Sequence, residues 1–161
     1  MAVQYPDPIQ AFRFLIKVEG SGSISAAFTR CSGIRMEVET LEGREGWDLR
    51  GVKISTPVLT RYEPVTLSKG VVGDCDFLDW IFAASAGDYT GPSGSSLRRT
   101  IDIITLNDLG QPGVTWTLSG AMPIGYEVPP LDGSRSEVLT ESLTLAYTGM
   151  KRKAEARQQP Q

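Results

Sequence analysis

The sequence predicts a mainly β protein: a β-barrel or sandwich of two packed antiparallel sheets with one short α-helix outside it. Two observations support this prediction. Several segments of the 161-residue chain alternate apolar and polar side chains and are separated by turn residues, as strands with one buried face are. Only residues 73–88 have the apolar spacing of a helix. The length is that of one domain with a sizeable core.

The first two strands are expected near the N-terminus. In residues 11–18, apolar side chains occupy every second position, and Arg13 and Lys17 lie between them. This alternation is typical of a strand that buries one face. A second strand is expected at about residues 24–31, after a turn rich in glycine and serine.

The next segment combines a clear strand with a stretch that has no clear period. Residues 34–42 alternate strictly, with charged side chains at every second position, and predict a strand. Residues 43–57 hold three glycines, a proline and mixed charges, which predicts a long loop or an extended hairpin arm. On such an arm, Trp47 would either contact a partner or fold back onto its own domain.

The middle of the chain predicts a strand and then the helix. A long strand is expected at residues 58–70, with Pro64 marking an edge position or a bulge. In the helix over residues 73–88, Asp74 is the expected N-cap and Gly87 the expected C-cap. The helix is apolar on most sides, whereas packing on one sheet needs a single apolar stripe. The remaining apolar surface must be covered by a long loop or by another subunit.

The C-terminal half predicts three more strands. Residues 98–108 and 113–128 are two strand segments joined by a hairpin turn, and residues 137–150 form the last strand. One face of the last strand is apolar, and the other carries uncharged hydroxyl side chains. We therefore expect a single domain over residues 1–150, followed by a flexible, basic and glutamine-rich tail at residues 151–161.

The composition argues against catalysis. The net charge is −3 and the chain has no histidine, which removes the usual general base, the Ser–His and Cys–His nucleophile pairs and the commonest transition-metal ligand. Phosphate loops, dinucleotide-binding glycines and nucleophile elbows are absent from the sequence. We expect no enzyme activity, no cofactor and no metal site.

The cysteines and the apolar runs bear on the compartment. Cys31 and Cys75 fit no metal-binding spacing and are expected to be free thiols in a reducing compartment. The N-terminus lacks the pattern of a signal peptide. No apolar run approaches the length of about 20 residues that a membrane span needs, so no membrane anchor is expected.

Two other classes of function are open to a chain of this kind. A monomeric β-barrel that binds a small molecule would have a cavity with a few convergent polar groups. A hydrolase could use the carboxylates of Asp74, Asp76 and Asp79, but helix capping and the polar stripe of the helix explain these residues more simply.

Taken in order, the segments resemble the inner tube protein family of contractile phage tails and contractile injection systems, the T4-like tail tube family. The resemblance runs from about residue 7 to residue 151 and rests on the order of its pieces. They are "DPIQAFRFLIKVEG", "FTRCSGIRMEVETLEGREG", "YEPVTLSKGVVGDCDFLDWI" and the closing segment from "RTIDIITL" to "LAYTGMK". The family's Arg-Lys-Leu-Pro-Gly segment is replaced here by "LRGVKISTPVLTRYEP".

The resemblance implies a structural role. Proteins of this family form hexameric rings that stack into a hollow tube inside a contractile sheath, which drives the tube through a target envelope. The implied partners are copies of the chain itself, the sheath protein, baseplate, spike and tube-cap proteins, and DNA or protein cargo in the lumen. The particle would be assembled in the bacterial cytoplasm and could be released. A baseplate-proximal tube initiator and a secreted ring-forming relative are the alternatives within the family.

The resemblance also implies three surfaces that would meet neighbouring subunits or cargo. The arm that reaches the next ring would present Trp47, Arg50, Val52, Lys53 and Ile54. The helix would contact a neighbouring subunit through Phe77, Trp80, Ile81 and Ala84. The lumen would be lined either by Glu37 and Glu39 or by Thr140, Ser142 and Thr144.

Overall fold

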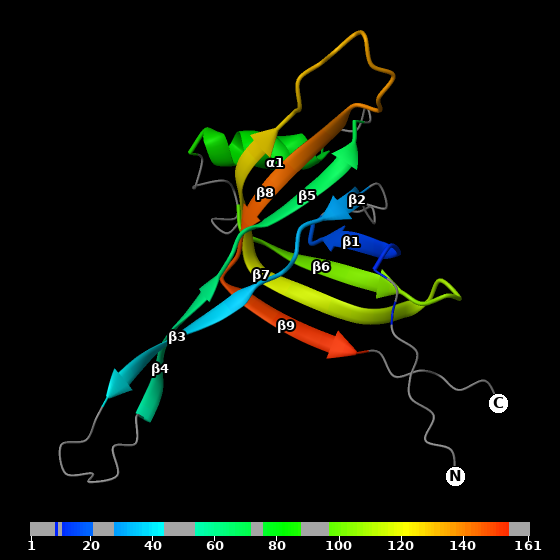
Figure 1. Ribbon diagram of the computed structural model, residues 1–161. Helices are drawn as coiled ribbons and strands as arrows, with labels where there is room; N and C mark the ends of the chain where they lie inside the picture. The colour runs from blue at the N-terminus through cyan, green and yellow to red at the C-terminus, as the bar shows by residue number, and fades with distance from the viewer. Residues whose placement is uncertain are drawn as a thin grey trace, which may run out of the picture.

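The computed structural model describes residues 9, 11–20, 28–43, 54–71, 76–87 and 97–154 (Figure 1). The elements in these ranges are β1 (Phe14–Val18), β2 (Phe28–Cys31), β3 (Met36–Gly43), β4 (Ile54–Tyr62), β5 (Val65–Gly70), α1 (Asp76–Ser85), β6 (Arg99–Leu106), β7 (Pro112–Glu127), β8 (Thr140–Ala146) and β9 (Gly149–Ala154). The predicted class, mainly β with one short helix, is confirmed.

The strands form two antiparallel sheets. The larger sheet has seven strands in the order β1-β6-β7-β8-β5-β2, with β9 also paired to β7, and the smaller sheet is the pair β3-β4. Because this order has two ends, the described strands do not close into a barrel. The expected barrel or sandwich is therefore an open, strongly bent sheet with a projecting hairpin.

The bend lies in the 16-residue strand β7, which changes partners along its length. Its first part pairs with β6 and β9, and its last part pairs with β8. Gly120, at the changeover, has a φ of 63°, which side chains other than glycine rarely adopt. Beside it, the Thr148 N–H donates to the Ser119 carbonyl oxygen over 3.0 Å and joins the β8–β9 corner to β7.

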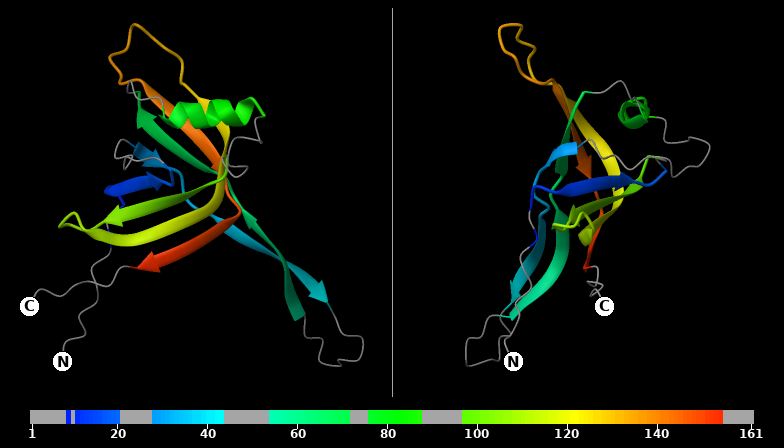
Figure 2. Two further views of the ribbon diagram at one scale, coloured as in Figure 1. Left: turned by 180° about the vertical axis from the view of Figure 1, so that it is seen from behind. Right: turned by 90° about the vertical axis from the view of Figure 1, so that its right-hand side faces the viewer.

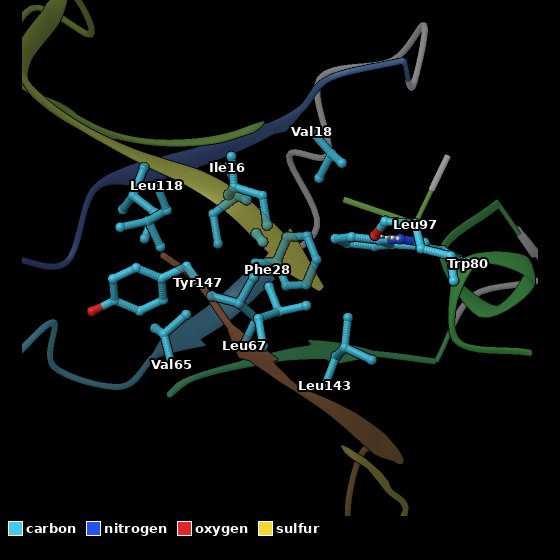
Figure 3. Close-up of a cluster of buried hydrophobic side chains, with 14 residues drawn as sticks. Ile16, Val18, Phe28, Val65, Leu67, Trp80, Leu97, Leu118, Leu143 and Tyr147 are labelled. Atoms are coloured by element: carbon cyan, nitrogen blue, oxygen red, sulfur yellow. Dashed lines mark hydrogen bonds between the residues drawn. The ribbon is translucent and has the colours of Figure 1, made fainter. Parts of the chain in front are cut away.

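The two halves of the bent sheet bury their facing sides against each other (Figure 3). Ile16 and Leu118 from one half and Leu67 and Leu145 from the other have no exposed surface. Alternation explains this core, because each strand contributes every second side chain. The helix lies alongside the half that contains β8, at the opposite end of the molecule from the β3–β4 hairpin (Figures 1 and 2).

Within the described residues the helix spans Asp76–Ser85, inside the predicted range of residues 73–88. The expected N-cap, Asp74, lies outside the described residues. The expected C-cap is confirmed: Gly87 has a φ of 66°, and its N–H donates to the Ala84 carbonyl oxygen over 3.3 Å.

The hairpin is longer than the arm that the sequence predicts. Its two strands are Met36–Gly43 and Ile54–Tyr62, so the predicted strand at residues 34–42 belongs mostly to the projecting hairpin and not to the body of the domain. Figure 2 shows it extending away from the larger sheet. The predicted strand at residues 58–70 is likewise divided at Pro64 into β4 and β5, because proline has no N–H for a ladder.

The last predicted strand is also divided. Residues 137–139 precede the strand β8, and β9 follows a corner at Tyr147 and Thr148. Strand β9 continues to Ala154, because its backbone pairs with Val114–Ser119 of β7. The segment that we expected to be a flexible tail from residue 151 therefore begins as part of the sheet.

Candidate assembly surfaces

The hairpin surface, defined as strands β3 and β4, is the most exposed regular structure described. All eight residues of β3 are exposed. Met36, Val38, Leu41, Val58 and Leu59 are each between 44% and 66% exposed. Exposed apolar side chains concentrated on one projecting element are typical of a surface that a partner covers.

Polar contacts fix the direction in which the hairpin projects. At its base the Arg35 guanidinium lies 3.3 Å from the Glu63 carboxylate, and the Glu63 N–H donates to the Arg35 carbonyl oxygen over 3.1 Å. The hydroxyl of the buried Tyr147 donates to the same carbonyl over 3.3 Å. The Tyr147 and Tyr62 rings lie 5.3 Å apart. Burial raises the pKa of the Tyr147 hydroxyl above its ordinary value.

Most of the predicted arm residues lie beyond the described part of the hairpin. Trp47, Arg50, Val52 and Lys53 fall in residues 44–53, outside the described ranges. Ile54 begins β4, where its backbone pairs with Gly43. Their contact with a neighbouring ring stays a prediction.

The helix surface differs from the one that we expected. Trp80 is only 2% exposed, and its indole N–H donates to the Leu97 carbonyl oxygen over 2.9 Å (Figure 3). The Arg99 guanidinium lies 5.0 Å from its ring. Ile81 and Ala84 also pack against the core of their own chain.

Among the described side chains of the helix, the large apolar one that is exposed is Phe82, at 60% exposure. We therefore move the proposed inter-subunit contact of the helix from Trp80 to Phe82. Part of the apolar surface of the helix, which the sequence left without an assigned partner, packs against the core of its own chain. The side chain of Phe77 is not described.

The hydroxyl surface lies on the outer face of β5 and β8. Across these strands the hydroxyls of Thr66 and Thr144 are 3.2 Å apart, and those of Ser68 and Ser142 are 2.8 Å apart. Thr140 continues the row opposite Gly70. The structure thus brings together the three predicted hydroxyl residues of β8 and adds two on β5. Glu37 and Glu39 lie on the hairpin and are not part of this row.

A buried polar cluster, which we did not predict, lies on the inner face of the same two strands. The Lys69 ammonium is 3.4 Å from the Glu141 carboxylate, and both residues are 4% exposed. The Tyr126 hydroxyl donates to Glu141 over 2.9 Å from a side chain that is 41% exposed. Partial desolvation together with this carboxylate raises the pKa of Tyr126. Lys69 follows Val65 and Leu67 at every second position of β5, and this spacing could have indicated that it lies on the buried face. Lys69 and Glu141 form a pair because they lie directly opposite each other on β5 and β8.

Nothing in the described residues indicates a metal site or a membrane-spanning helix. No three acidic or cysteine side chains there gather closely enough to hold a metal ion. The described ranges contain no helix long and apolar enough to cross a membrane. Cys31 is a free thiol, and Cys75 lies outside the described residues.

Solved structures with a similar fold come from contractile particles. A chain in the anti-feeding prophage (AFP) baseplate is 24% identical, with a TM-score of 0.78 and coverage of 93% of this chain and 98% of that one. A chain in the sheath-tube complex of the extracellular contractile injection system PVC is 26% identical, with a TM-score of 0.74 and coverage of 95% of both. One in the AFP tube terminating cap is 27% identical, with a TM-score of 0.75 and coverage of 96% and 95%.

The fold and these likenesses define a structural protein of the tail-tube type. The family model of the T4-like virus tail tube protein gp19 matches residues 10–151, and the chain belongs to that family. A comparison with curated protein sequences finds no match. The resemblance inferred from the ordered sequence segments is therefore confirmed.

Proposed function

We propose that this chain is the repeating subunit of the inner tube of a contractile tail or injection system. In this proposal six copies form a ring, the rings stack into a hollow tube, and contraction of a surrounding sheath drives the tube through a target envelope. Membership of the tail tube family supports the tube-type role. The observation that carries the proposal is the hairpin surface, whose apolar side chains reach 66% exposure in the single chain. A partner that covers them removes an unfavourable apolar–water surface.

The partners follow from the position of such a tube. Outside it would lie the sheath protein, and at its ends baseplate, spike and cap proteins. Inside it would pass DNA or protein cargo. The row of hydroxyl side chains on Thr140, Ser142 and Thr144 is one candidate lining, because an uncharged hydrophilic wall lets polar cargo slide without holding it. Glu37 and Glu39 are the second candidate lining. We expect assembly in the bacterial cytoplasm, followed by incorporation into a phage tail or tail-like particle.

The proposal is tested by the assembly state of the purified chain. Size-exclusion chromatography with light scattering gives the mass, and negative-stain electron microscopy with two-dimensional classification gives the symmetry. We expect six-fold rings or tubes of stacked rings. A monodisperse monomer at high protein concentration in mild buffer would contradict the proposal and would favour the small-molecule-binding barrel.

A second candidate function is the first ring of the tube at the baseplate. The observation in its favour is the fold shared with a chain in the AFP baseplate, at a TM-score of 0.78. The same micrographs separate the candidates, since a main tube subunit extends into long tubes whereas an initiator, or a secreted ring-forming relative, stops at isolated rings.

A further inference from the structure

Strand β9 carries a basic edge that the described residues of its own chain do not neutralise. Lys151, Arg152 and Lys153 are consecutive and exposed. The described strands pair β9 with β7 alone, so its other side is an edge. We define these three residues as the basic edge. Three adjacent positive charges on one short strand repel one another, which is tolerated best where a counter-charge is near.

Within the described part of the chain, the side chains directly opposite the basic edge are neutral. Its residues lie opposite Thr117, Trp116 and Thr115 of β7, in that order. The nearest carboxylate along this row is that of Asp102 on β6, and it accepts a hydrogen bond from the Thr117 hydroxyl over 2.6 Å. Within the described ranges, no carboxylate lies within ion-pair distance of the basic edge.

The hairpin surface carries the opposite charge. Glu37 and Glu39 alternate with apolar residues on β3 and share one face, with Arg61 on β4 as the neighbouring cation. Arg61 forms an ion pair with Glu39 and lies directly opposite Glu37, so one cation serves two carboxylates. Glu42, near the end of the same strand, adds a further negative charge.

Spacing matches as well as sign. Lys151 and Lys153 point to one face of β9, and Glu37 and Glu39 point to one face of β3, because side chains on a strand repeat every second residue. In both pairs the two residues are therefore about 7 Å apart along the strand. A strand that lies against the other can bring each carboxylate to one ammonium.

We propose that the acidic face of β3 in one copy of the chain docks on the basic edge of β9 in a second copy. Another possible partner for the basic edge is β1, the strand at one end of the larger sheet, in a second copy. That pairing is unfavourable, because β1 carries Lys17 and follows Arg13, so like charges would meet. Opposite charges fix the register of the contact and speed its formation. This inference rests on the proposed self-assembly and adds the residues that direct it.

Nucleic acid is the other polyanion that a basic strand could meet. The net charge of −3 and the matched acidic pair on the chain itself favour a second copy. Reversing the charges on both the basic edge and the acidic face of β3 distinguishes these occupants. The reversed charges can still attract each other between two copies of the chain, whereas an acidic edge cannot bind nucleic acid.

The test is a charge swap between two exposed sites. We expect Lys151→Glu/Lys153→Glu to lower the assembled fraction at least tenfold at low salt, with the thermal midpoint of the unassembled chain unchanged. Glu37→Lys/Glu39→Lys should have the same effect. The quadruple variant, which restores opposite charges in the reversed sense, should regain most of the assembly. The matched control is Lys17→Glu/Arg30→Glu, on β1 and β2 at the two ends of the larger sheet. It changes the net charge by the same amount and should assemble like the wild type.

Each result has one meaning. Failure of the wild-type chain to assemble would contradict the proposed function itself. Normal assembly of Lys151→Glu/Lys153→Glu, with the wild type also assembled, would overturn only the docking proposal. Loss of assembly without rescue in the quadruple variant would overturn it too. Retention of nucleic acid by the wild type, lost in that double variant while rings persist, would assign the basic edge to nucleic acid.

Discussion

At the scale of single residues, Gly120 is a position in the bent sheet where an added side chain meets both an unfavourable backbone angle and a close neighbour. Its φ of 63° disfavours a side chain, and a Cβ there would collide with the Thr148 hydroxyl, which donates to the Ser119 carbonyl oxygen over 3.3 Å. The strained backbone alone costs about 1–2 kcal/mol. We expect Gly120→Ala to lower the free energy of unfolding by about 3 kcal/mol, measured by urea denaturation of the unassembled chain.

Gly110 offers a matched control for that substitution. It has a φ of 75°, but a Cβ there would have no atom within 4 Å. Gly110→Ala should therefore lose only the backbone contribution, about 1–2 kcal/mol. Equal losses at the two glycines would show that the contact with Thr148 does not hold the corner.

Cys31 is the residue whose protonation the fold changes most clearly. Burial raises the pKa of its thiol from the ordinary value of 9.0 to about 11. The thiolate is the reactive form, so we expect iodoacetamide at pH 8 to modify Cys31 at least tenfold more slowly in the folded chain than in urea. A Cys75→Ser background leaves Cys31 as the only thiol. Equal rates in the two states would contradict the burial of the thiol.

The same shift makes stability depend on pH in a defined direction. Because the folded pKa lies above the unfolded one, the contribution of Cys31 is fully present below about pH 9 and is lost as the pH rises toward 11. The difference in unfolding free energy between the wild type and Cys31→Ala isolates this contribution. It should be constant from pH 7 to 8.5 and then change in favour of the alanine variant.

At the scale of elements, Trp80 joins the helix to the start of β6. Its ring is almost fully buried, and its indole N–H donates to the Leu97 carbonyl oxygen. We expect Trp80→Ala to lower the free energy of unfolding by about 3–5 kcal/mol, as truncation of a buried aromatic side chain does. Trp80→Phe keeps most of the ring and removes the indole donor, so it should lose about 1–2 kcal/mol. Thermal melts that leave Trp80→Ala unchanged would show that the helix is not anchored there.

The elements also show what alternation in a sequence can establish. It predicted the strands around Ile16, Val38 and Leu143, because apolar and polar side chains alternate along each of them. It did not reveal that Val38 belongs to a projecting hairpin. An apolar face looks the same in the sequence whether its own sheet or a partner covers it.

The assignment of surfaces shows the same limit in more detail. The hydroxyl residues of β8 were found together, since Thr140, Ser142 and Thr144 share a strand face by spacing alone. We expected Trp80 to contact a neighbouring subunit, but it packs inside its own chain. Its partners Leu97 and Arg99 lie in a different segment, and the sequence gives no sign of the contact. Contacts between segments far apart in the chain leave no period in the sequence.

At the scale of the whole molecule, the charge and the apolar surface of the hairpin act together. In the proposed docking, the acidic residues of β3 would set the register with which a neighbour is met, and the apolar residues would supply the area that is removed from water. The base of the hairpin holds both in a fixed direction through Arg35, Glu63 and Tyr147. A prearranged hairpin loses less conformational entropy on docking than a flexible loop would.

Assembly should therefore be separable from folding at the exposed apolar residues of the hairpin. Leu41 is 66% exposed, so Leu41→Asp removes little packing within its own chain. We expect its thermal midpoint to stay within about 2 °C of the wild type, since surface substitutions rarely cost more than about 0.5 kcal/mol. The yield of rings and tubes in negative-stain images should fall at least tenfold, because a buried, unpaired carboxylate at the contact is costly.

Leu109 provides the comparison for this last prediction. It is 82% exposed in the turn between β6 and β7, away from the hairpin surface, and Leu109→Asp makes the same chemical change. This control should assemble and melt like the wild type. Equal assembly of the two aspartate variants would show that the hairpin is not an interface. If Leu41→Asp lowered both the melting temperature and the yield of assembly, Leu41 would instead stabilise its own chain. Unfolding of the chain would then explain the loss of assembly.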